Sequence, residues 1–145
     1  MPKDLTTSRL DRQNILNNEI AVEEIQEKSG IEGIVWNQKL YFTREMTANF
    51  FEVDIRTITR YIDQFNNELV ENGYEVLKGK KLKEFKETAQ AYGKDINVPT
   101  KTTVLGIFDF RSFLNLSMLL SESEKNQISN AYITNREIRN KINKQ

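Results

Sequence analysis

The stretch that decides the fold is FTREMTANFFEVDIRTITRYI, residues 42–62. It predicts two helices that meet at a sharp turn. Thr43 can cap the first helix, and Asp54 can cap the second, which we expect to run to about Glu71. Ala48 is a small residue at the point where the two helices would cross, and Val53 is an apolar residue that would fill the angle between them. This pattern is typical of a helix-turn-helix unit.

The second helix of this unit would have one buried side and one exposed side. Ile58 and Ile62 are four residues apart and therefore share a face. In helix-turn-helix proteins the opposite face enters the major groove, where arginine can pair with guanine through two hydrogen bonds. We therefore predict base contacts from Arg56, Thr57, Thr59 and Arg60. The alternative is an ordinary pair of core helices whose polar face is only solvated.

Residues 42–62 resemble the helix-turn-helix of virulence-type RhuM proteins and related prophage antirepressor-like DNA-binding proteins. Their pattern reads roughly L-T-Q-E-Q-L-A-E-L-F-G-V-S-R-x-T-I-S-R-x-I. The chain matches it without a gap at Thr43, Glu45, Ala48, Phe51, Val53, Thr57, Ile58, Arg60 and Ile62. The turn glycine of the family is Glu52 here, and Thr47 stands where an apolar residue precedes the alanine. If position 52 is left-handed, a residue with a side chain costs about 1 kcal/mol there.

The resemblance covers about residues 34–90 and implies a DNA-binding regulator of a prophage or another mobile element. Such proteins often carry a further C-terminal region, so a short or truncated relative is one interpretation of this chain.

A basic segment follows the predicted recognition helix. Residues 73–77 predict a strand, KGKK at residues 78–81 predicts a tight turn, and residues 82–92 have a helical pattern. A strand with a lysine-rich turn at this place is typical of a wing that contacts DNA phosphates. We predict phosphate contacts from Lys78, Lys80, Lys81 and Lys83. The alternative is a solvated charged turn.

The remaining patterns complete the predicted fold, which is mainly α with a small β-hairpin and a wing. Residues 20–28 predict a helix, and residues 33–36 and 39–42 predict a hairpin around Asn37-Gln38. The predicted organisation is a flexible arm at 1–19, a winged helix-turn-helix domain at 20–94, a linker at 95–103 and a C-terminal helical extension at 104–145.

The segment Val104–Leu120 is the most apolar part of the chain, and it predicts a buried helix followed by a polar final helix. Core packing is the favoured interpretation of this segment, and a homodimer seam is the alternative.

The composition excludes several classes of protein. The 145 residues include no cysteine and no histidine, which removes disulfides, zinc fingers, thiol nucleophiles and histidine bases. We expect no enzyme activity, no cofactor and no metal site. The 21 basic and 21 acidic residues balance, so nucleic-acid binding would need a local patch. No long apolar run or signal peptide is evident, and we expect a cytoplasmic protein without membrane contact.

The predicted function is double-stranded DNA binding as a transcriptional regulator. An alternative from another class is an inhibitor of host defence of the anti-CRISPR kind, which would hold a nuclease or its guide RNA. The acidic residues Asp63, Glu68, Glu71 and Glu75 have no basic residue among them, so their side of the molecule must face away from DNA or toward a protein partner. A third interpretation is an antitoxin-type DNA-binding module.

Overall fold

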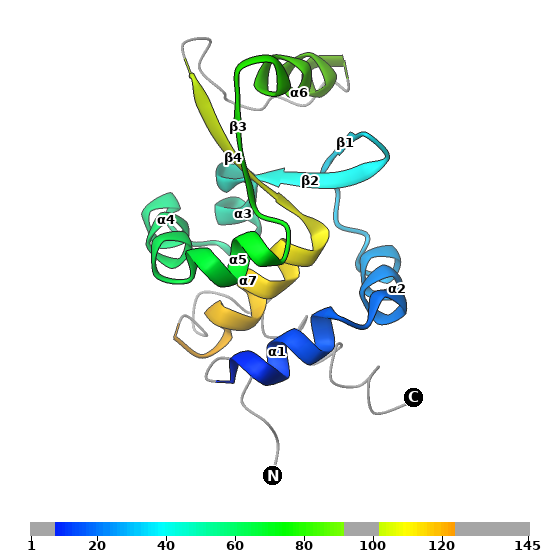
Figure 1. The fold of residues 1–145 in the computed structure, drawn as a ribbon, viewed down its shortest axis with the longest axis vertical. Coiled ribbons are helices and arrows are strands. Elements are labelled where there is room, and N and C mark those ends of the chain that lie inside the picture. The colour runs from blue at the N-terminus through cyan, green and yellow to red at the C-terminus, as the bar shows by residue number, and fades with distance from the viewer. Residues whose placement is uncertain (1–7, 92–101, 124–145) are drawn as a thin grey trace.

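The computed structural model describes residues 8–91 and 102–123, the last three by their backbone only. This part of the chain is mainly helical and contains a small antiparallel sheet (Figure 1). Its elements follow in the order α1 Arg9–Leu16, α2 Glu19–Ser29, β1 Ile34–Trp36, β2 Lys39–Thr43, α3 Arg44–Phe51, α4 Ile55–Gln64, α5 Asn66–Glu71, β3 Glu75–Lys78, α6 Gly79–Ala91, β4 Val104–Asp109 and α7 Phe110–Ser123.

The sheet has the strand order β1-β2-β4-β3, and every neighbouring pair is antiparallel. The predicted hairpin is confirmed as β1 and β2, with Asn37 and Gln38 in the left-handed region at φ 51 and 67. Two residues with positive φ are what a tight hairpin turn requires. The predicted helix at 20–28 is likewise confirmed as α2, which ends at left-handed Gly30.

β4 corrects the prediction of a buried helix from residue 104. Residues 104–109 form an inner strand, paired with β2 on one side and β3 on the other. The helix α7 begins only at Phe110. An apolar run shows no period that separates a buried strand from a buried helix, and the strand contains Gly106 and two β-branched residues, Val104 and Ile107.

The position of β4 also removes the predicted division of the chain. The sheet of the predicted winged domain is complete only with a strand from the predicted C-terminal extension. Residues 92–101 of the predicted linker region and the predicted final helix lie outside the described residues. The strands before and after the predicted linker therefore belong to one sheet.

The two faces of the sheet carry separate apolar cores. Neighbouring residues on a strand point to opposite faces, so Tyr41 and Ile107 face α6 while Phe42 and Phe108 face the other helices. Figure 1 shows α6 on one side of the sheet and α3, α5 and α7 on the other. The core beneath α6 consists of Ile34, Trp36, Tyr41, Leu77, Leu82, Phe85, Ala89 and Ile107.

α7 is the centre of the larger core. Phe113 stacks on Phe42 and Phe51 at centroid distances of 4.4 and 5.1 Å, and Leu116 and Met118 are fully buried. The core interpretation of residues 104–120 is confirmed. Within that segment Val104 is the one large apolar side chain that is exposed, so the segment offers no apolar dimer seam.

α1 corrects the prediction that residues 1–19 form a flexible arm. Residues 9–16 are helical, Ser8 caps the helix by accepting a hydrogen bond from the Asp11 amide, and Ile15 and Leu16 are buried. The sequence of α1 is polar because much of its contact with the rest of the chain is polar. Residues 1–7 lie outside the described residues.

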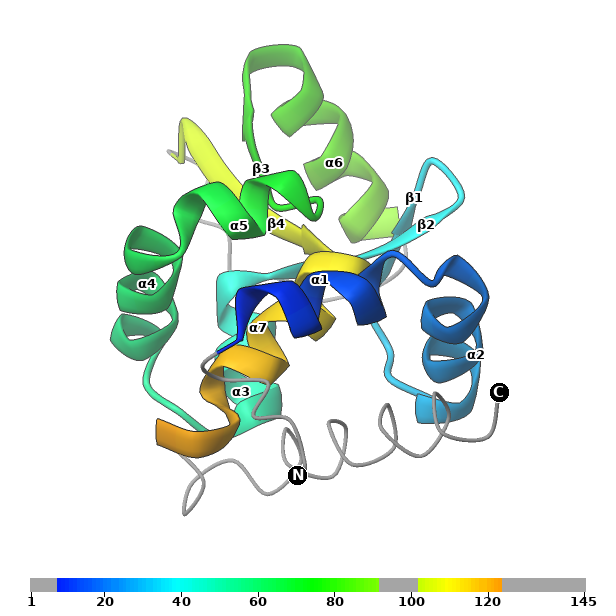
Figure 2. The same cartoon turned by 60° about the horizontal axis from the view of Figure 1, so that its bottom comes forward.

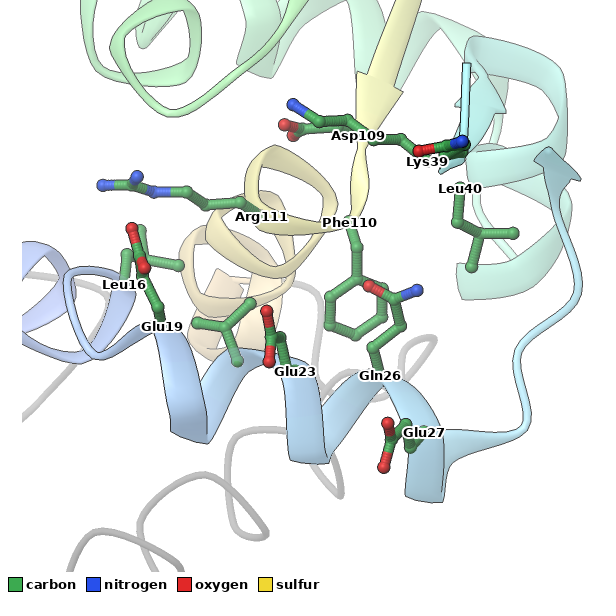
Figure 3. A pocket seen from close by; sticks show the side chains of 12 residues that line it. Leu16, Glu19, Glu23, Gln26, Glu27, Lys39, Leu40, Asp109, Phe110 and Arg111 are labelled. Carbon is green, nitrogen blue, oxygen red and sulfur yellow. The ribbon is translucent and has the colours of Figure 1, made fainter. Parts of the chain in front are cut away.

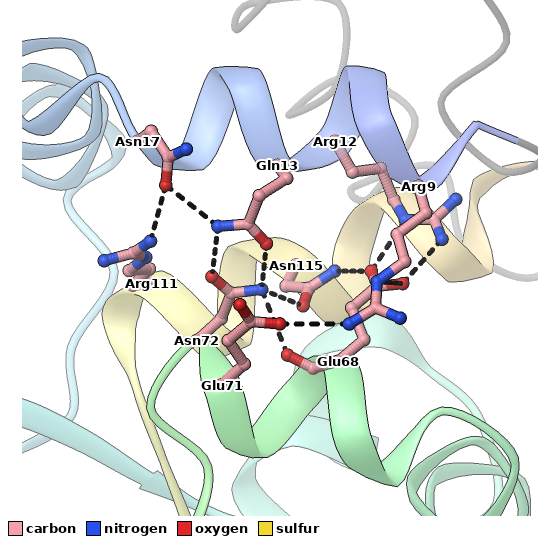
Figure 4. Close-up of polar contacts among 9 residues, drawn as sticks. All are labelled: Arg9, Arg12, Gln13, Asn17, Glu68, Glu71, Asn72, Arg111 and Asn115. Carbon is pink, nitrogen blue, oxygen red and sulfur yellow. Dashed lines mark hydrogen bonds and ion pairs between the residues drawn. The ribbon is translucent and has the colours of Figure 1, made fainter.

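A buried polar network holds α1 against α5 and α7 (Figure 4). The Arg12 guanidinium donates two hydrogen bonds of 2.7 Å to the Glu68 carboxylate, which also accepts from Asn115 at 2.6 Å. Asn72 donates to Gln13 and to Asn115, both at 3.0 Å. Burial tends to raise the pKa of Glu68, but the hydrogen bonds from Arg12 and Asn115 and the nearby arginine charges outweigh it and lower that pKa.

Candidate nucleic-acid interface

α3 and α4 are two helices joined by a short turn, at the position where the sequence predicts a helix-turn-helix. Thr43 caps α3 by accepting a hydrogen bond from the Met46 amide at 3.1 Å, and Asp54 caps α4 through the Arg56 amide at 2.8 Å. Glu52 is left-handed at φ 58 and ψ 42, as the family's turn glycine implies. The Val53 amide donates to the Ala48 carbonyl at 3.0 Å, which fixes the turn. Figures 1 and 2 both show α4 at the outer edge of the molecule.

The inner side of this unit is closely packed. Ala48, Ile58 and Ile62 are buried, as predicted. Thr47 is also fully buried, and its hydroxyl donates to the Thr43 carbonyl at 2.8 Å. A hydroxyl that is satisfied within its own helix can replace the family's apolar residue without leaving an unpaired polar group.

α4 is shorter than predicted. It ends at Gln64, and Phe65, at φ −115 and ψ 30, separates it from α5. The ring of Phe65 stacks on Tyr61 at 5.9 Å, while α5 turns to bury Leu69 and Glu68. The predicted continuous helix to Glu71 is therefore wrong.

The four predicted base-reading residues differ in exposure. Arg56 and Arg60 are exposed, whereas Thr57 and Thr59 are half-buried. The Thr59 hydroxyl accepts a hydrogen bond from Arg44 on α3 at 3.4 Å. The Arg60 guanidinium lies 5.5 Å from the centre of the Tyr61 ring, where a cation is weakly attracted. The two arginines are therefore the most exposed side chains of this set.

Arg56 is already paired within the chain. Its Nε lies 3.1 Å from Asp54 Oδ1, although the two side chains are 89% and 54% exposed. The hydrogen bond from the Arg56 side chain lowers the pKa of Asp54, and the same contact raises the pKa of Arg56. Both groups are charged at neutral pH, so an anionic ligand of Arg56 has to compete with Asp54.

The four lysines lie at the end of β3 and the start of α6 and not on a wing hairpin, which corrects the prediction. Lys78 ends β3, left-handed Gly79 reverses the chain at φ 55, and α6 begins at once. β3 pairs with β4, which follows α6 in the chain. The helix predicted at residues 82–92 is confirmed as α6, which begins three residues earlier than predicted, and its residues Leu82, Phe85 and Ala89 are buried against the sheet.

The structure places the lysines and the arginines on different elements. Lys78, Lys80, Lys81 and Lys83 are all exposed, and Lys81 Nζ lies 3.3 Å from Glu75 Oε1. α6 covers one face of the sheet, while α4 packs on α3 and α5 beyond the other face. Among the residues that the structure describes, the lysines and the arginines are therefore two separate basic features, and neither is a wing next to a recognition helix.

A cleft that the sequence did not predict lies between α2 and the junction of β4 with α7 (Figure 3). Its volume is about 520 Å³. Glu19 and Glu23 project from α2 toward Arg111 and Phe110 on the opposite wall. Arg111 donates to Asn17 at 3.0 Å, and its buried Nε has no hydrogen-bond partner.

Two further classes of site are absent from the residues that the structure describes. Those residues hold no cluster of three acidic side chains that could bind a metal ion. They also contain no helix with the length and apolar character that a membrane crossing needs.

No protein family, curated protein or solved structure matches this chain. A function therefore has to be argued from the geometry of α3, α4 and α6.

Proposed function

We propose that the protein binds double-stranded DNA through α3 and α4, as a transcriptional regulator of a prophage or another mobile element and a relative of the RhuM-type proteins. The observation that carries this proposal is the arrangement of α4. Its inner side is anchored by the buried residues Ile58 and Ile62, and Arg56 and Arg60 of the same helix are exposed. Figure 2 shows the helix itself at the edge of the molecule. An exposed second helix of this kind is the element that enters the major groove.

The charge distribution favours specific contacts over general attraction to DNA. The chain has no net charge, and α4 carries Asp63 as well as its two arginines. Affinity should therefore depend on hydrogen bonds to base edges more than on a broad basic field. The lysines at the start of α6 offer a second group of phosphate contacts, with the flexible point charges that suit this role.

Selection of duplexes from a random pool, followed by affinity measurements on the best site, tests this proposal. Replacing Arg56 or Arg60 with alanine should cost about 1–3 kcal/mol of specific binding free energy and relax the sequence preference. Arg9→Ala is the matched control, because Arg9 is an exposed arginine on α1. Unchanged affinity of the Arg56→Ala, Arg60→Ala double variant would exclude the base-reading role.

A second candidate, an inhibitor that holds a host nuclease or its guide RNA, is favoured by one observation. Arg56 of α4 is paired with Asp54, while the four lysines are exposed at the end of β3 and the start of α6. If the protein is such an inhibitor, it should bind duplex DNA weakly and structured RNA or a ribonucleoprotein strongly. Replacing the four lysines with alanine would then abolish RNA binding, whereas the Arg60→Ala variant would retain it.

A further inference from the structure

Arg44, the first residue of α3, connects three elements through one side chain. Its Nε and Nη2 donate hydrogen bonds of 3.1 and 2.8 Å to the Tyr74 hydroxyl, and its Nη1 donates to the Thr59 hydroxyl at 3.4 Å. Its guanidinium carbon lies 6.0 Å from the centre of the Tyr74 ring. Tyr74 directly precedes β3, so the contact joins the start of α3, the middle of α4 and the sheet.

β4 leaves room for this contact through a glycine. A Cβ atom on Gly106 would collide with the Tyr74 hydroxyl and would lie 3.0 Å from Arg44 Nε. Glycine inside a strand weakens the strand and often marks the close approach of another group. The Arg44–Tyr74 contact is therefore the physical reason for a glycine at the middle of an inner strand.

The contact adds a directional restraint to the apolar packing of α4. Tyr61, Ile58 and Ile62 hold α4 against the core, but apolar contacts have no preferred direction. Hydrogen bonds are directional, so the one to Thr59 opposes rotation of α4 about its axis. Such a rotation would move Arg56 and Arg60 away from the base edges, where contacts tolerate errors of about half an ångström.

We infer that Arg44 is a positioning residue for DNA recognition. Tyr74 holds its guanidinium by hydrogen bonds, and Gly106 leaves the space that this contact needs. Arg44 fixes the rotation of α4 and thereby the direction of Arg56 and Arg60. This inference rests on the proposed function.

Tyr74→Phe tests the inference most selectively, because it removes one hydroxyl from a side chain that is 3% exposed and cannot itself touch DNA. The ratio of specific to non-specific duplex affinity should fall about tenfold, as expected for the loss of a hydrogen bond to a charged group. Non-specific affinity should not change. Arg44→Lys keeps the charge but loses the planar fork, and it should cause the same loss.

The double variant should lose no more discrimination than either single variant, because both changes break the same contact. Tyr41→Phe is the matched control, since Tyr41 is a buried tyrosine that faces α6 on the other side of the sheet. A melting curve of each variant shows that it is folded, and the affinity ratio is then compared.

The outcomes separate this inference from the proposed function. If the wild type discriminates between duplexes and both folded variants discriminate equally well, the role of Arg44 is excluded. An equal loss in Tyr41→Phe would exclude it too, because the effect would not depend on α4. If the wild type itself prefers no duplex, the proposed function fails first and this inference fails with it.

Discussion

Glu52 is a residue that pays a conformational cost at the turn between α3 and α4. It is exposed and left-handed at φ 58, a region that disfavours any residue with a Cβ atom. Glu52→Gly should raise the free energy of unfolding by about 1 kcal/mol, because the relief of strain exceeds the entropy that glycine adds to the unfolded chain. Thermal melting measures this change.

Glu52→Ala is the control for that prediction, since it removes the carboxylate but keeps the Cβ atom and the strain. The alanine variant should gain no stability. A glycine variant that melts below the wild type would contradict the left-handed assignment of position 52.

Arg12 and Glu68 form a buried ion pair whose disruption should be costly. Arg12→Met leaves the Glu68 carboxylate buried without its main partner, and we expect a loss of about 3–5 kcal/mol in the free energy of unfolding. Arg9→Met is the matched control, because Arg9 contacts the same carboxylate at 3.8 Å from an exposed position. Exposed pairs contribute at most about 1 kcal/mol. Equal losses in the two variants would contradict the buried network.

The same pair predicts a dependence on pH. Since the pKa of Glu68 is lowered in the folded protein, its stabilisation is fully present above the unfolded value of 4.5 and disappears as the pH falls through the folded value. The difference in the free energy of unfolding between the wild type and Arg12→Met should therefore shrink as the pH falls through the folded pKa of Glu68. Denaturant unfolding at a series of pH values measures it, and a constant difference would contradict the lowered pKa.

At the scale of single elements, α4 offers a variant that separates capping from charge pairing. Asp54→Asn keeps an oxygen that can accept from the Arg56 amide, but it releases the Arg56 side chain. If Arg56 contacts DNA, the variant should bind its best duplex several-fold more tightly at unchanged helix stability. Fluorescence anisotropy with a labelled duplex measures this affinity.

Asp63→Asn is the control for that experiment, because it removes the same charge from the same helix without freeing an arginine. If both variants gain the same affinity for the duplex, the cause is the change in net charge and not the release of Arg56. No gain in Asp54→Asn would mean that Arg56 does not reach the DNA.

The elements that the sequence predicted well are those with local signals. The caps at Thr43 and Asp54 and the hairpin turn at Asn37-Gln38 depend on a few neighbouring residues, and all are present in the structure. The wing prediction was wrong because KGKK at residues 78–81 was interpreted as a tight turn, whereas only Gly79 turns the chain and the helix predicted at 82–92 already begins there. The helical spacing predicted that Arg56 and Arg60 lie on the exposed face of α4. It did not predict that the Arg56 side chain pairs with Asp54, because that depends on the side-chain conformation.

At the scale of the whole molecule, the central position of β4 predicts that the described residues fold together. A fragment of residues 1–94 lacks the strand that pairs with both β2 and β3, and it lacks the α7 core around Phe113. We expect this fragment to show no cooperative melting and little dispersion of its amide resonances. The whole chain is the reference. If the fragment melts in one sharp cooperative transition, the predicted independent domain at 20–94 is supported instead.

Long-range contacts explain what the sequence could not show at this scale. The residues around Arg12 give no sign that it pairs with Glu68, which lies 56 residues further along the chain. The polar sequence of α1 therefore predicted a flexible arm. Likewise, residues 104–109 are recognisable as a strand only through their pairing with β2 and β3. Local patterns define the ends of elements, while pairing between distant segments decides the sheet.

Amide chemical-shift mapping with the best selected duplex shows whether the exposed side of α4 is the surface that binds DNA. We expect the largest shifts at the turn at Glu52 and in α4, including Arg56 and Arg60, with smaller shifts at the lysines around the start of α6. Shifts confined to α6 or to the cleft beside α2, with α4 unchanged at saturation, would exclude DNA binding through α4.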